Sequence, residues 1–414
     1  MGSHLNWLPE ANLNRVSTDQ TCRLWGNPDG QYWREVGRPQ VHGHDFSCVA
    51  FVSNDVYVSG SEEKVARVFD NSLTDERGAR VQVRLPALGL SNVVCQDARD
   101  GNGNKDVDGL RGGDVGGDVN SVLAKGTHAS ITEEDLSQNT LWPEIRKLYG
   151  HGNDLYRLVA DPRGRFIASS SRAQEPVSAA VIVWDTTTWT EVARCAGHDL
   201  TVTCMDCNDS GDLLATVGRD RKLIVWERLG GAEDEGSISG WRIRASKPKA
   251  HARVIWGCAW ANQEKEGKEE MRQLHRSTLI TSARDGSISA WDVLDAALVK
   301  KAEIKLASSV TTVAAQGSLI AAGLESGHVV ILVLREDDDR DDCDDRDDCD
   351  DRDDCDPRNR VCGLDVVCTC GEEGRHAGAV RRVHFCPGNK NDRSRGEASL
   401  LLSSVGDDGA VKFW

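Results

Sequence analysis

Apolar and polar residues alternate along residues 197–226 in short runs that turn residues separate. The stretch begins with Gly197-His198, turns at residues 208–211 and ends on an apolar run at residues 223–226. Period-two alternation over runs of this length is typical of antiparallel strands, and Asn, Asp, Ser and Gly between the runs indicate tight turns. We therefore predict consecutive strands here.

Four side chains of this stretch are spaced to form one network: His198, Thr216, Asp220 and Trp226. Asp220 would accept a hydrogen bond from His198, and His198 would meet the Thr216 hydroxyl and the closing indole. Such contacts tie the loop that enters a sheet to a turn within it and give each buried polar group a partner. A Gly-His start, this spacing and a Trp end are typical of a WD40 repeat. The alternative is an ordinary hairpin with a core histidine.

The same offsets recur later in the chain. Asp285 lies six residues before Trp291, Thr281 lies four residues before Asp285, and the matching histidine would be His251. A third copy has the corresponding residues His376, Ser404, Asp408 and Trp414.

A copy near the start of the chain keeps Asp19 and Trp25, and two weaker copies occur at residues 60–69 and 321–333. Repeats therefore end near residues 25, 69, 184, 226, 291, 333 and 414. We predict an all-β fold, a WD40 β-propeller of about seven four-stranded blades with long disordered insertions.

The repeat positions suggest how the 414 residues are divided. Residues 1–40 resemble the later strands of a blade, because no Gly-His precedes them at the required distance. We interpret them as a partial blade, either the end of an upstream propeller or a closing blade. Residues 41–414 would form the propeller, with insertions at 97–130 and 335–360. Ring closure is expected, because an open ring leaves strand edges unpaired.

The net charge of −16 arises mainly from one segment. Residues 336–356 contain fifteen acidic residues and three arginines, so the rest of the chain is nearly neutral. A segment of this composition repels itself, and we predict a solvated insertion. No run of 18 apolar residues is present, so no membrane span is expected. The N-terminus has no apolar core of a signal peptide, which favours an intracellular protein.

Cysteine and acidic motifs do not favour a metal site. Cys204 and Cys207 lie in a strand pattern that already explains them, as buried cysteine behaves as a small apolar residue. The same holds for the group of Cys362, Cys368, Cys370 and Cys386 with His376 and His384. We expect no catalytic residue, no cofactor and no metal, since no phosphate loop or HExxH motif occurs and the repeats account for the Asp and His residues. The chain is not expected to be an enzyme.

One candidate partner surface can be named from the repeats. The Gly-His loops and the turns between central strands emerge on one face of a propeller, which would bring together Arg219, Arg221, Arg253 and Arg284. Arginine pairs well with carboxylates and phosphates. We hypothesise that these side chains bind an acidic partner segment or an RNA backbone; the alternative is ordinary solvated turn residues.

Four stretches outside the repeat pattern resemble the second, WD40-containing subunit of the Elongator complex: WREVGRPQVHGHD (33–45), LPALGLSN (85–92), QNTLWPEIRKLYGHG (138–152) and HARVIWGCAW (251–260). The chain looks like the C-terminal half of that double propeller. The resemblance implies a non-catalytic scaffold in a complex that modifies the wobble uridine of tRNA. It also implies contacts with the largest and the catalytic subunit, with tRNA at most indirectly, and a cytoplasmic location with some nuclear presence.

Two functions stay open beside this one. A generic WD40 adaptor for protein–protein interaction would have the same repeats. A propeller that binds RNA directly would need a dominant basic face with stacking aromatics, which a nearly neutral chain does not favour. A ubiquitin-ligase receptor is disfavoured, because the residues after Trp184, Trp226 and Trp291 lack its usual Trp-Asp-x-Arg signature.

Overall fold

The computed structural model describes residues 3–7, 13–17, 20–26, 32–74, 81, 83–84, 92–94, 133, 136, 139–229, 240–261, 277–335, 363–371, 373–386 and 401–414. The predicted insertion at 97–130 and nearly all of that at 335–360 lie outside these ranges. Asp19 and Cys362 also lie outside them.

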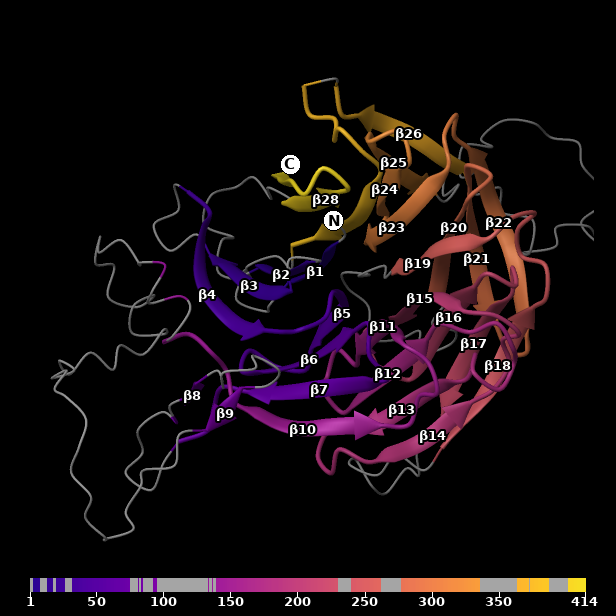
Figure 1. Cartoon of the computed structure of the whole chain (residues 1–414). Helices are drawn as coiled ribbons and strands as arrows, with labels where there is room; N and C mark the ends of the chain where they lie inside the picture. Colours follow the sequence, from indigo (N-terminus) through magenta and orange to yellow (C-terminus); the bar gives the residue numbers. More distant parts are fainter. Residues whose placement is uncertain are drawn as a thin grey trace, which may run out of the picture.

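Seven antiparallel sheets follow one another around a ring (Figure 1). Blade 1 consists of β1 (Ser3–Trp7), β2 (Leu13–Ser17), β3 (Thr21–Gly26) and β4 (Arg34–Val41). Blade 2 consists of β5 (Phe46–Phe51), β6 (Val56–Ser61), β7 (Val65–Asp70) and β10 (Glu144–Tyr149). Blade 3 consists of β11 (Leu155–Ala160), β12 (Phe166–Ser171), β13 (Val181–Asp185) and β14 (Glu191–Cys195).

The remaining blades follow in chain order. Blade 4 consists of β15 (Val202–Cys207), β16 (Leu213–Gly218), β17 (Leu223–Arg228) and β18 (Trp241–Lys247). Blade 5 consists of β19 (Ile255–Ala261), β20 (Ser277–Ala283), β21 (Ser287–Leu294) and β22 (Ala297–Lys305). Blade 6 consists of β23 (Val310–Gln316), β24 (Leu319–Leu324), β25 (Val329–Arg335) and β26 (Gly363–Thr369). Blade 7 consists of β27 (Val380–Phe385), β28 (Leu402–Gly406) and β29 (Val411–Phe413).

This arrangement confirms the predicted all-β WD40 propeller. Six of the sheets have four strands, and blade 7 has three strands among the described residues, where we expected about seven four-stranded blades. Two short strands, β8 (Val83–Arg84) and β9 (Val93–Val94), pair with each other beside blade 2 (Figure 1). Within the described residues, no helix is long and apolar enough to cross a membrane.

The first strand of each blade lines the axis of the ring, and the last strand lies at the rim (Figure 1). The two middle strands of a blade are covered on both faces by the neighbouring blades. Every residue of β13 and β16 is therefore buried, which explains their nearly continuous apolar sequences. Rim strands keep more exposed positions, as in β22 and β26. The rim strands therefore face solvent over much of their length, whereas the inner strands do not.

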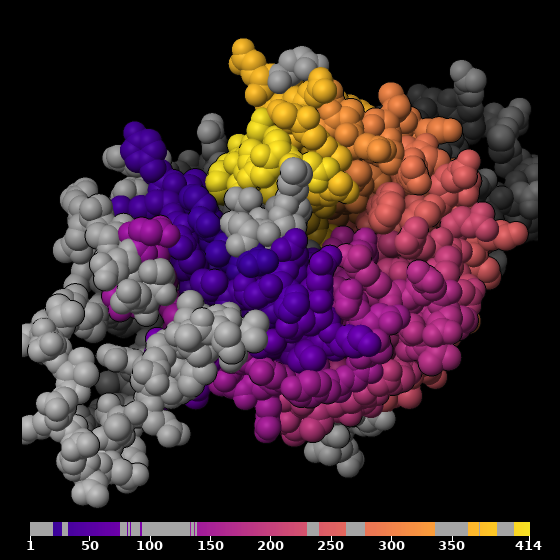
Figure 2. Space-filling view, in the orientation of Figure 1, coloured from indigo at the N-terminus to yellow at the C-terminus, as the bar shows by residue number. Residues whose placement is uncertain are grey.

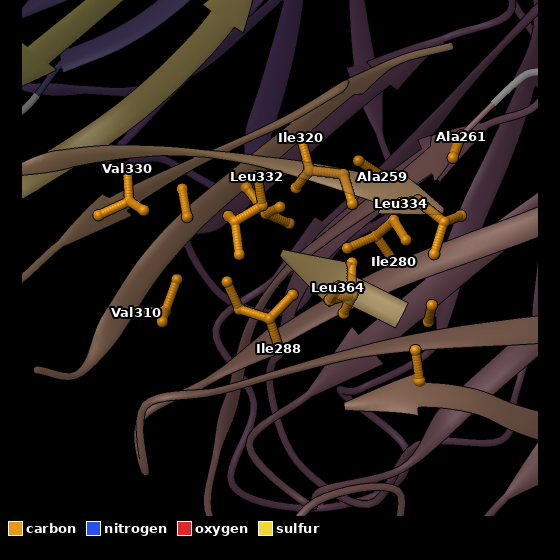
Figure 3. Packing of buried hydrophobic residues seen from close by; sticks show 14 of the residues in the cluster. Ala259, Ala261, Ile280, Ile288, Val310, Ile320, Val330, Leu332, Leu334 and Leu364 are labelled. Atoms are coloured by element: carbon orange, nitrogen blue, oxygen red, sulfur yellow. The ribbon is translucent and has the colours of Figure 1, made fainter. Parts of the chain in front are cut away.

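The core consists of apolar clusters between successive blades. Between blades 5 and 6, Ile280 and Ile288 pack with Ile320 and Leu332 (Figure 3), and each of these side chains is fully buried. Burying one such side chain contributes about 1.5–3 kcal/mol. Because every blade shares its two faces with its neighbours, the clusters hold the blades in a fixed order around the axis.

Blade 1 lies between blade 2 and blade 7, with β1 beside both β5 and β27. The Trp33 ring stacks on the Phe413 ring with centroids 4.5 Å apart, and Trp25 packs on the cluster around Val405. The first and last blades adjoin on the molecular surface (Figure 2). Residues 3–41 hold four strands, where we expected only the later strands of a blade. The assignment of residues 1–40 and 41–414 to separate units stays a prediction.

Candidate partner-binding face

A hydrogen-bond network in blade 4 fixes the loops on one face of the propeller. His198 Nδ1 lies 3.0 Å from Asp220 Oδ2, and His198 Nε2 lies 2.9 Å from Thr216 Oγ1. Trp226 Nε1 donates to the same hydroxyl at 2.9 Å. Burial raises the pKa of Asp220, but the hydrogen bond from His198 and two from backbone N–H groups outweigh it, so the pKa is below its usual value. The loop before β15 is thereby tied to the turn between β16 and β17.

Blade 5 closes its network differently, which corrects the expected contact between His251 and Asp285. His251 Nδ1 lies 2.7 Å from Ser287 Oγ, and Ser287 donates its own hydroxyl proton to Asp285. At the other end, Thr281 Oγ1 contacts His251 Nε2 and accepts from Trp291 Nε1. Burial lowers the pKa of His251 to about 4. The imidazole is therefore neutral at physiological pH, and the serine relays the contact.

Blade 7 has the direct arrangement seen in blade 4. His376 Nδ1 lies 3.0 Å from Asp408 Oδ1, and His376 Nε2 lies 2.8 Å from Ser404 Oγ. Trp414 Nε1 donates to Ser404 Oγ at 2.9 Å. Ser404, Asp408 and Trp414 have the same offsets in the sequence as Thr216, Asp220 and Trp226 of blade 4, whereas His376 lies farther along the chain from its hydroxyl partner than His198 does.

A further network in blade 3 was missed by sequence reasoning. His151 Nε2 lies 2.7 Å from Ser169 Oγ, which also accepts from Trp184 Nε1 at 2.8 Å. Burial lowers the pKa of His151 to about 4. The Gly150-His151 dipeptide was the available signal, but the segment 172–180 lengthens the turn between β12 and β13 and changes the offsets.

The four predicted arginines lie in loops at the junction of blades 4 and 5, and backbone hydrogen bonds connect these loops. The backbone N–H of Arg219 donates to Thr201 O, and the carbonyl of Arg221 accepts from Ala250 N. The backbone N–H of Arg284 donates to Val254 O, next to Arg253. All four arginines are exposed. None of the four guanidiniums forms an ion pair within the described part of the chain.

Arg221 has an unusual backbone conformation. Its φ is 67°, in the left-handed region that favours glycine, whereas the turns of blades 5 and 7 have Gly286 and Gly409 at the matching position. A non-glycine residue there costs about 1 kcal/mol. Blade 4 therefore keeps a long cationic side chain at a position where the other two blades have the residue best suited to the turn.

Segments that carry the sequence resemblance meet at the edge of blade 1. Asn92 Nδ2 donates both to Pro39 O at 2.8 Å and to Trp142 O at 2.7 Å. Trp142 N also donates to Pro39 O, and Arg38 N donates to Thr140 Oγ1. Residues from the stretches 33–45, 85–92 and 138–152 are thus joined in one buried contact, although repeat spacing did not predict it.

Comparisons with known proteins agree with this architecture. The family model for the WD domain, G-beta repeat, matches residues 189–227. Elongator complex protein 2 from Arabidopsis thaliana is 35% identical over 76% of this chain and 40% of its own length. The predicted resemblance to the second Elongator subunit is confirmed. The protein of that name from Saccharomyces cerevisiae is 30% identical over 78% of this chain and 43% of its own length, and the human one 29% identical over 81% and 44%.

The chain spans less than half the length of these Elongator complex protein 2 relatives. A chain in the crystal structure of the mitotic checkpoint complex has a TM-score of 0.57 and 14% identity, matched over 99% of this chain and 88% of that one. At this identity the likeness concerns the fold alone. The Elongator relatives differ from that crystal structure in their higher sequence identity, 29–35% over 76–81% of the chain.

Proposed function

We propose that this chain is a non-catalytic scaffold of the Elongator complex, which supports the assembly that modifies the wobble uridine of tRNA. The similarity to Elongator complex protein 2 over about three quarters of the chain carries this proposal. The proposed partners are the largest subunit and the catalytic subunit, and tRNA takes part at most indirectly. The proposed location is cytoplasmic with some nuclear presence.

A scaffold suits the chemistry of the described side chains. The histidines and carboxylates of blades 4 and 7 are held by each other and by backbone N–H groups, so they serve the fold. A WD40 propeller of this kind presents rigid loops on its faces, and rigid loops lose little conformational entropy on binding. Its function on this proposal is to position partners rather than to carry out chemistry.

The proposed docking site is the arginine face at blades 4 and 5, formed by Arg219, Arg221, Arg253 and Arg284. Three features support it. The guanidiniums are exposed, their loops are hydrogen-bonded to one another, and Arg221 keeps a strained backbone. Guanidinium groups form bidentate pairs with carboxylates, so the proposed partner segment is acidic.

A charge-reversal experiment tests this face. Arg219, Arg221 and Arg253 are changed together to Glu in the full-length protein, and the co-purifying Elongator subunits are quantified by mass spectrometry. A control reverses three exposed arginines that lie in strands, where each pairs with an acidic side chain: Arg194, Arg242 and Arg335. We expect at least a tenfold loss of partners with the face variant and little change with the control. Equal recovery of partners with both variants would remove the arginine face from the proposal.

Direct RNA binding is the second candidate, because the same exposed guanidiniums suit phosphates. It predicts that the isolated chain retains RNA in a filter assay and that retention falls steeply with salt. The face variant would then lose RNA retention as well as partners. A generic adaptor function would instead give co-purified proteins that are not Elongator subunits.

A further inference from the structure

Two cysteines from neighbouring blades meet between the inner strands. Cys204 lies on β15 of blade 4 and Cys258 on β19 of blade 5, and both side chains are buried in the cluster between these blades. Cys204 Sγ lies 3.8 Å from the backbone oxygen of Cys258, and the two free thiols hydrogen-bond to each other. The structure thus pairs Cys204 with a cysteine 54 positions along the chain, and not with Cys207, its neighbour in the sequence.

Contacts on both sides of this pair hold the two inner strands in register. On one side, the Thr203 hydroxyl donates to Ile255 O. On the other, Trp260 donates from its backbone N–H to the Asp206 carboxylate at 2.9 Å and from Nε1 to Asp206 O at 3.0 Å. Asp206 and Trp260 are 54 positions apart, the same separation as the two cysteines. The inner strands themselves therefore place the two thiols opposite each other.

The surroundings of Cys204 favour a thiolate. The Cys258 thiol hydrogen-bonds to its sulfur, and Arg382 Nη1 lies 3.7 Å from that sulfur. The hydrogen bond from Cys258 and, after it, the charges of Arg382 and Arg157 outweigh burial and hold the pKa of Cys204 well below its usual value. The same contact, together with burial, raises the pKa of Cys258 well above its usual value. One sulfur of the pair is thus a nucleophile, while the other keeps its proton.

Solvent comes close to Cys204, although the sulfur itself is enclosed. Cys204 is 2% exposed, whereas Arg382 beside it is half-buried and His384 is exposed. His384 lies two residues beyond Arg382 on β27, and alternate residues share one face of a strand. A small uncharged oxidant approaches where water does, but a peptide disulfide is too large to meet an enclosed sulfur.

We propose that Cys204 and Cys258 are a redox site, in which a small peroxide such as hydrogen peroxide converts the two thiols into a disulfide. The Cys204 thiolate attacks one peroxide oxygen, the O–O bond breaks and hydroxide leaves, so that Cys204 becomes a sulfenic acid. The Cys258 sulfur then attacks the Cys204 sulfur, the S–S bond forms and the S–O bond breaks. The thiol proton of Cys258 neutralises one of the two hydroxides released. The two sulfurs together lose two electrons, and the peroxide becomes one water and one hydroxide.

The disulfide would join blades 4 and 5 covalently between their inner strands. It would close a loop from residue 204 to residue 258, which restricts the unfolded chain and makes the folded chain harder to unfold. The bond would stabilise the junction whose loops carry the arginine face, and it does not depend on what that face binds.

The first measurement locates the bond. The full chain is treated with hydrogen peroxide, denatured and alkylated, and its peptides are identified by mass spectrometry. We expect a peptide pair linked through Cys204 and Cys258, which dithiothreitol separates. Oxidised glutathione at the same concentration should leave both cysteines reduced in the folded protein. Recovery of both as alkylated thiols after peroxide treatment would overturn the proposal.

Single substitutions separate the roles of the two sulfurs. Cys258→Ser should stop the reaction at the sulfenic acid of Cys204, which dimedone traps, whereas Cys204→Ser should leave Cys258 reduced. Cys207→Ser is the matched control and should form the linked peptides as the native chain does. Cys207 lies on the same strand as Cys204 but in the cluster between blades 3 and 4, and burial raises its pKa well above the usual value. Dimedone on Cys258 in Cys204→Ser, or equal labelling of Cys207, would contradict the assigned roles.

Two further readouts test the effect of the bond and of the nearby charge. The oxidised chain should unfold about 5 °C above the reduced chain, and dithiothreitol should reverse the rise. Arg382→Gln should slow disulfide formation by roughly tenfold, and Arg382→Lys should keep most of the rate, because a positive charge beside Cys204 stabilises the thiolate. No rise in Tm despite complete linkage would overturn the stabilising role. Equal rates in the two Arg382 variants would overturn the role of the charge.

Discussion

Blades 4 and 5 are neighbours with the same sequence spacing of threonine, aspartate and tryptophan, but they differ at the turn that forms the candidate face. In blade 4 the carboxylate of Asp220 contacts His198, and the next residue is Arg221 in a left-handed conformation. In blade 5, Ser287 stands between His251 and Asp285, and the next residue after the acid is Gly286. The contacts among histidine, hydroxyl and tryptophan are therefore the same in both blades. The turn that contains the acid differs, and it determines which side chains are exposed on the candidate face.

The largest expected effect comes from acid, through the buried histidine of blade 5. The pKa of His251 is about 4 in the folded state and about 6.5 in the unfolded chain, so protonation favours unfolding. Above pH 6.5 the histidine is neutral in both states and does not affect stability. As the pH falls from 6.5 toward 4, the unfolded chain takes up the proton first, and the free energy of unfolding falls by up to about 3 kcal/mol. Urea unfolding between pH 7 and pH 4 measures this. In His251→Gln the free energy of unfolding should depend less steeply on pH. An unchanged slope would mean that other groups cause the pH dependence.

The next effect concerns the hydroxyl that is common to both blades. Thr216→Val removes the partner of both His198 and Trp226 and should lower the free energy of unfolding by about 3 kcal/mol. Thr281→Val should cost about the same, because its hydroxyl has the same two roles in blade 5. Denaturant titration checks this, with the exposed Thr187→Val as control. A loss in one blade only would show that the networks are not equivalent.

A smaller effect should separate the two acids. Asp220→Asn weakens a direct contact with His198 and should cost about 2 kcal/mol. Asp285→Asn keeps the serine relay and should cost about half of that. Thermal unfolding at pH 7 compares the two variants. If Asp285→Asn lowered the free energy of unfolding as much as Asp220→Asn, the contact through Ser287 would depend on the carboxylate charge as strongly as the direct contact of Asp220 with His198.

The smallest effect has opposite signs in the two turns. Arg221→Gly relieves a strained backbone and should raise the free energy of unfolding by about 0.5–1 kcal/mol, while partner recovery falls. Gly286→Ala should lower it by about 1–2 kcal/mol, because the φ of 84° is unfavourable and the new Cβ would lie 2.5 Å from Leu306 O. Calorimetry and co-purification measure the two quantities. A less stable Arg221→Gly would mean that the side chain itself stabilises the turn.

Sequence reasoning worked where the determining contacts are close along the chain. Thr216, Asp220 and Trp226 lie within eleven residues, and strand geometry fixes their relative positions. The same offsets located the networks of blades 5 and 7. They failed in blade 3, where residues 172–180 lengthen a turn, and they did not show that Ser287 would intervene in blade 5.

Contacts between distant parts of the chain were not predictable in this way. Strand β10 joins blade 2 by pairing with β7 across a long insertion, and Asn92 bridges Pro39 and Trp142. Blade 1 could be interpreted only as a partial blade, because its first strands lack the Gly-His signal. No local pattern signals such pairings, as they depend on how neighbouring blades pack.

The sequence by itself determined the repeat, the kind of blade and the side chains that close each network, because those depend on spacing within a few strands. Only the tertiary structure decided which residues of separate blades meet at the axis. Arg382 of β27 and Cys204 of β15 are 178 positions apart in the chain, and they come together because blade 1 packs against blade 7 and so brings the last blade back to the others.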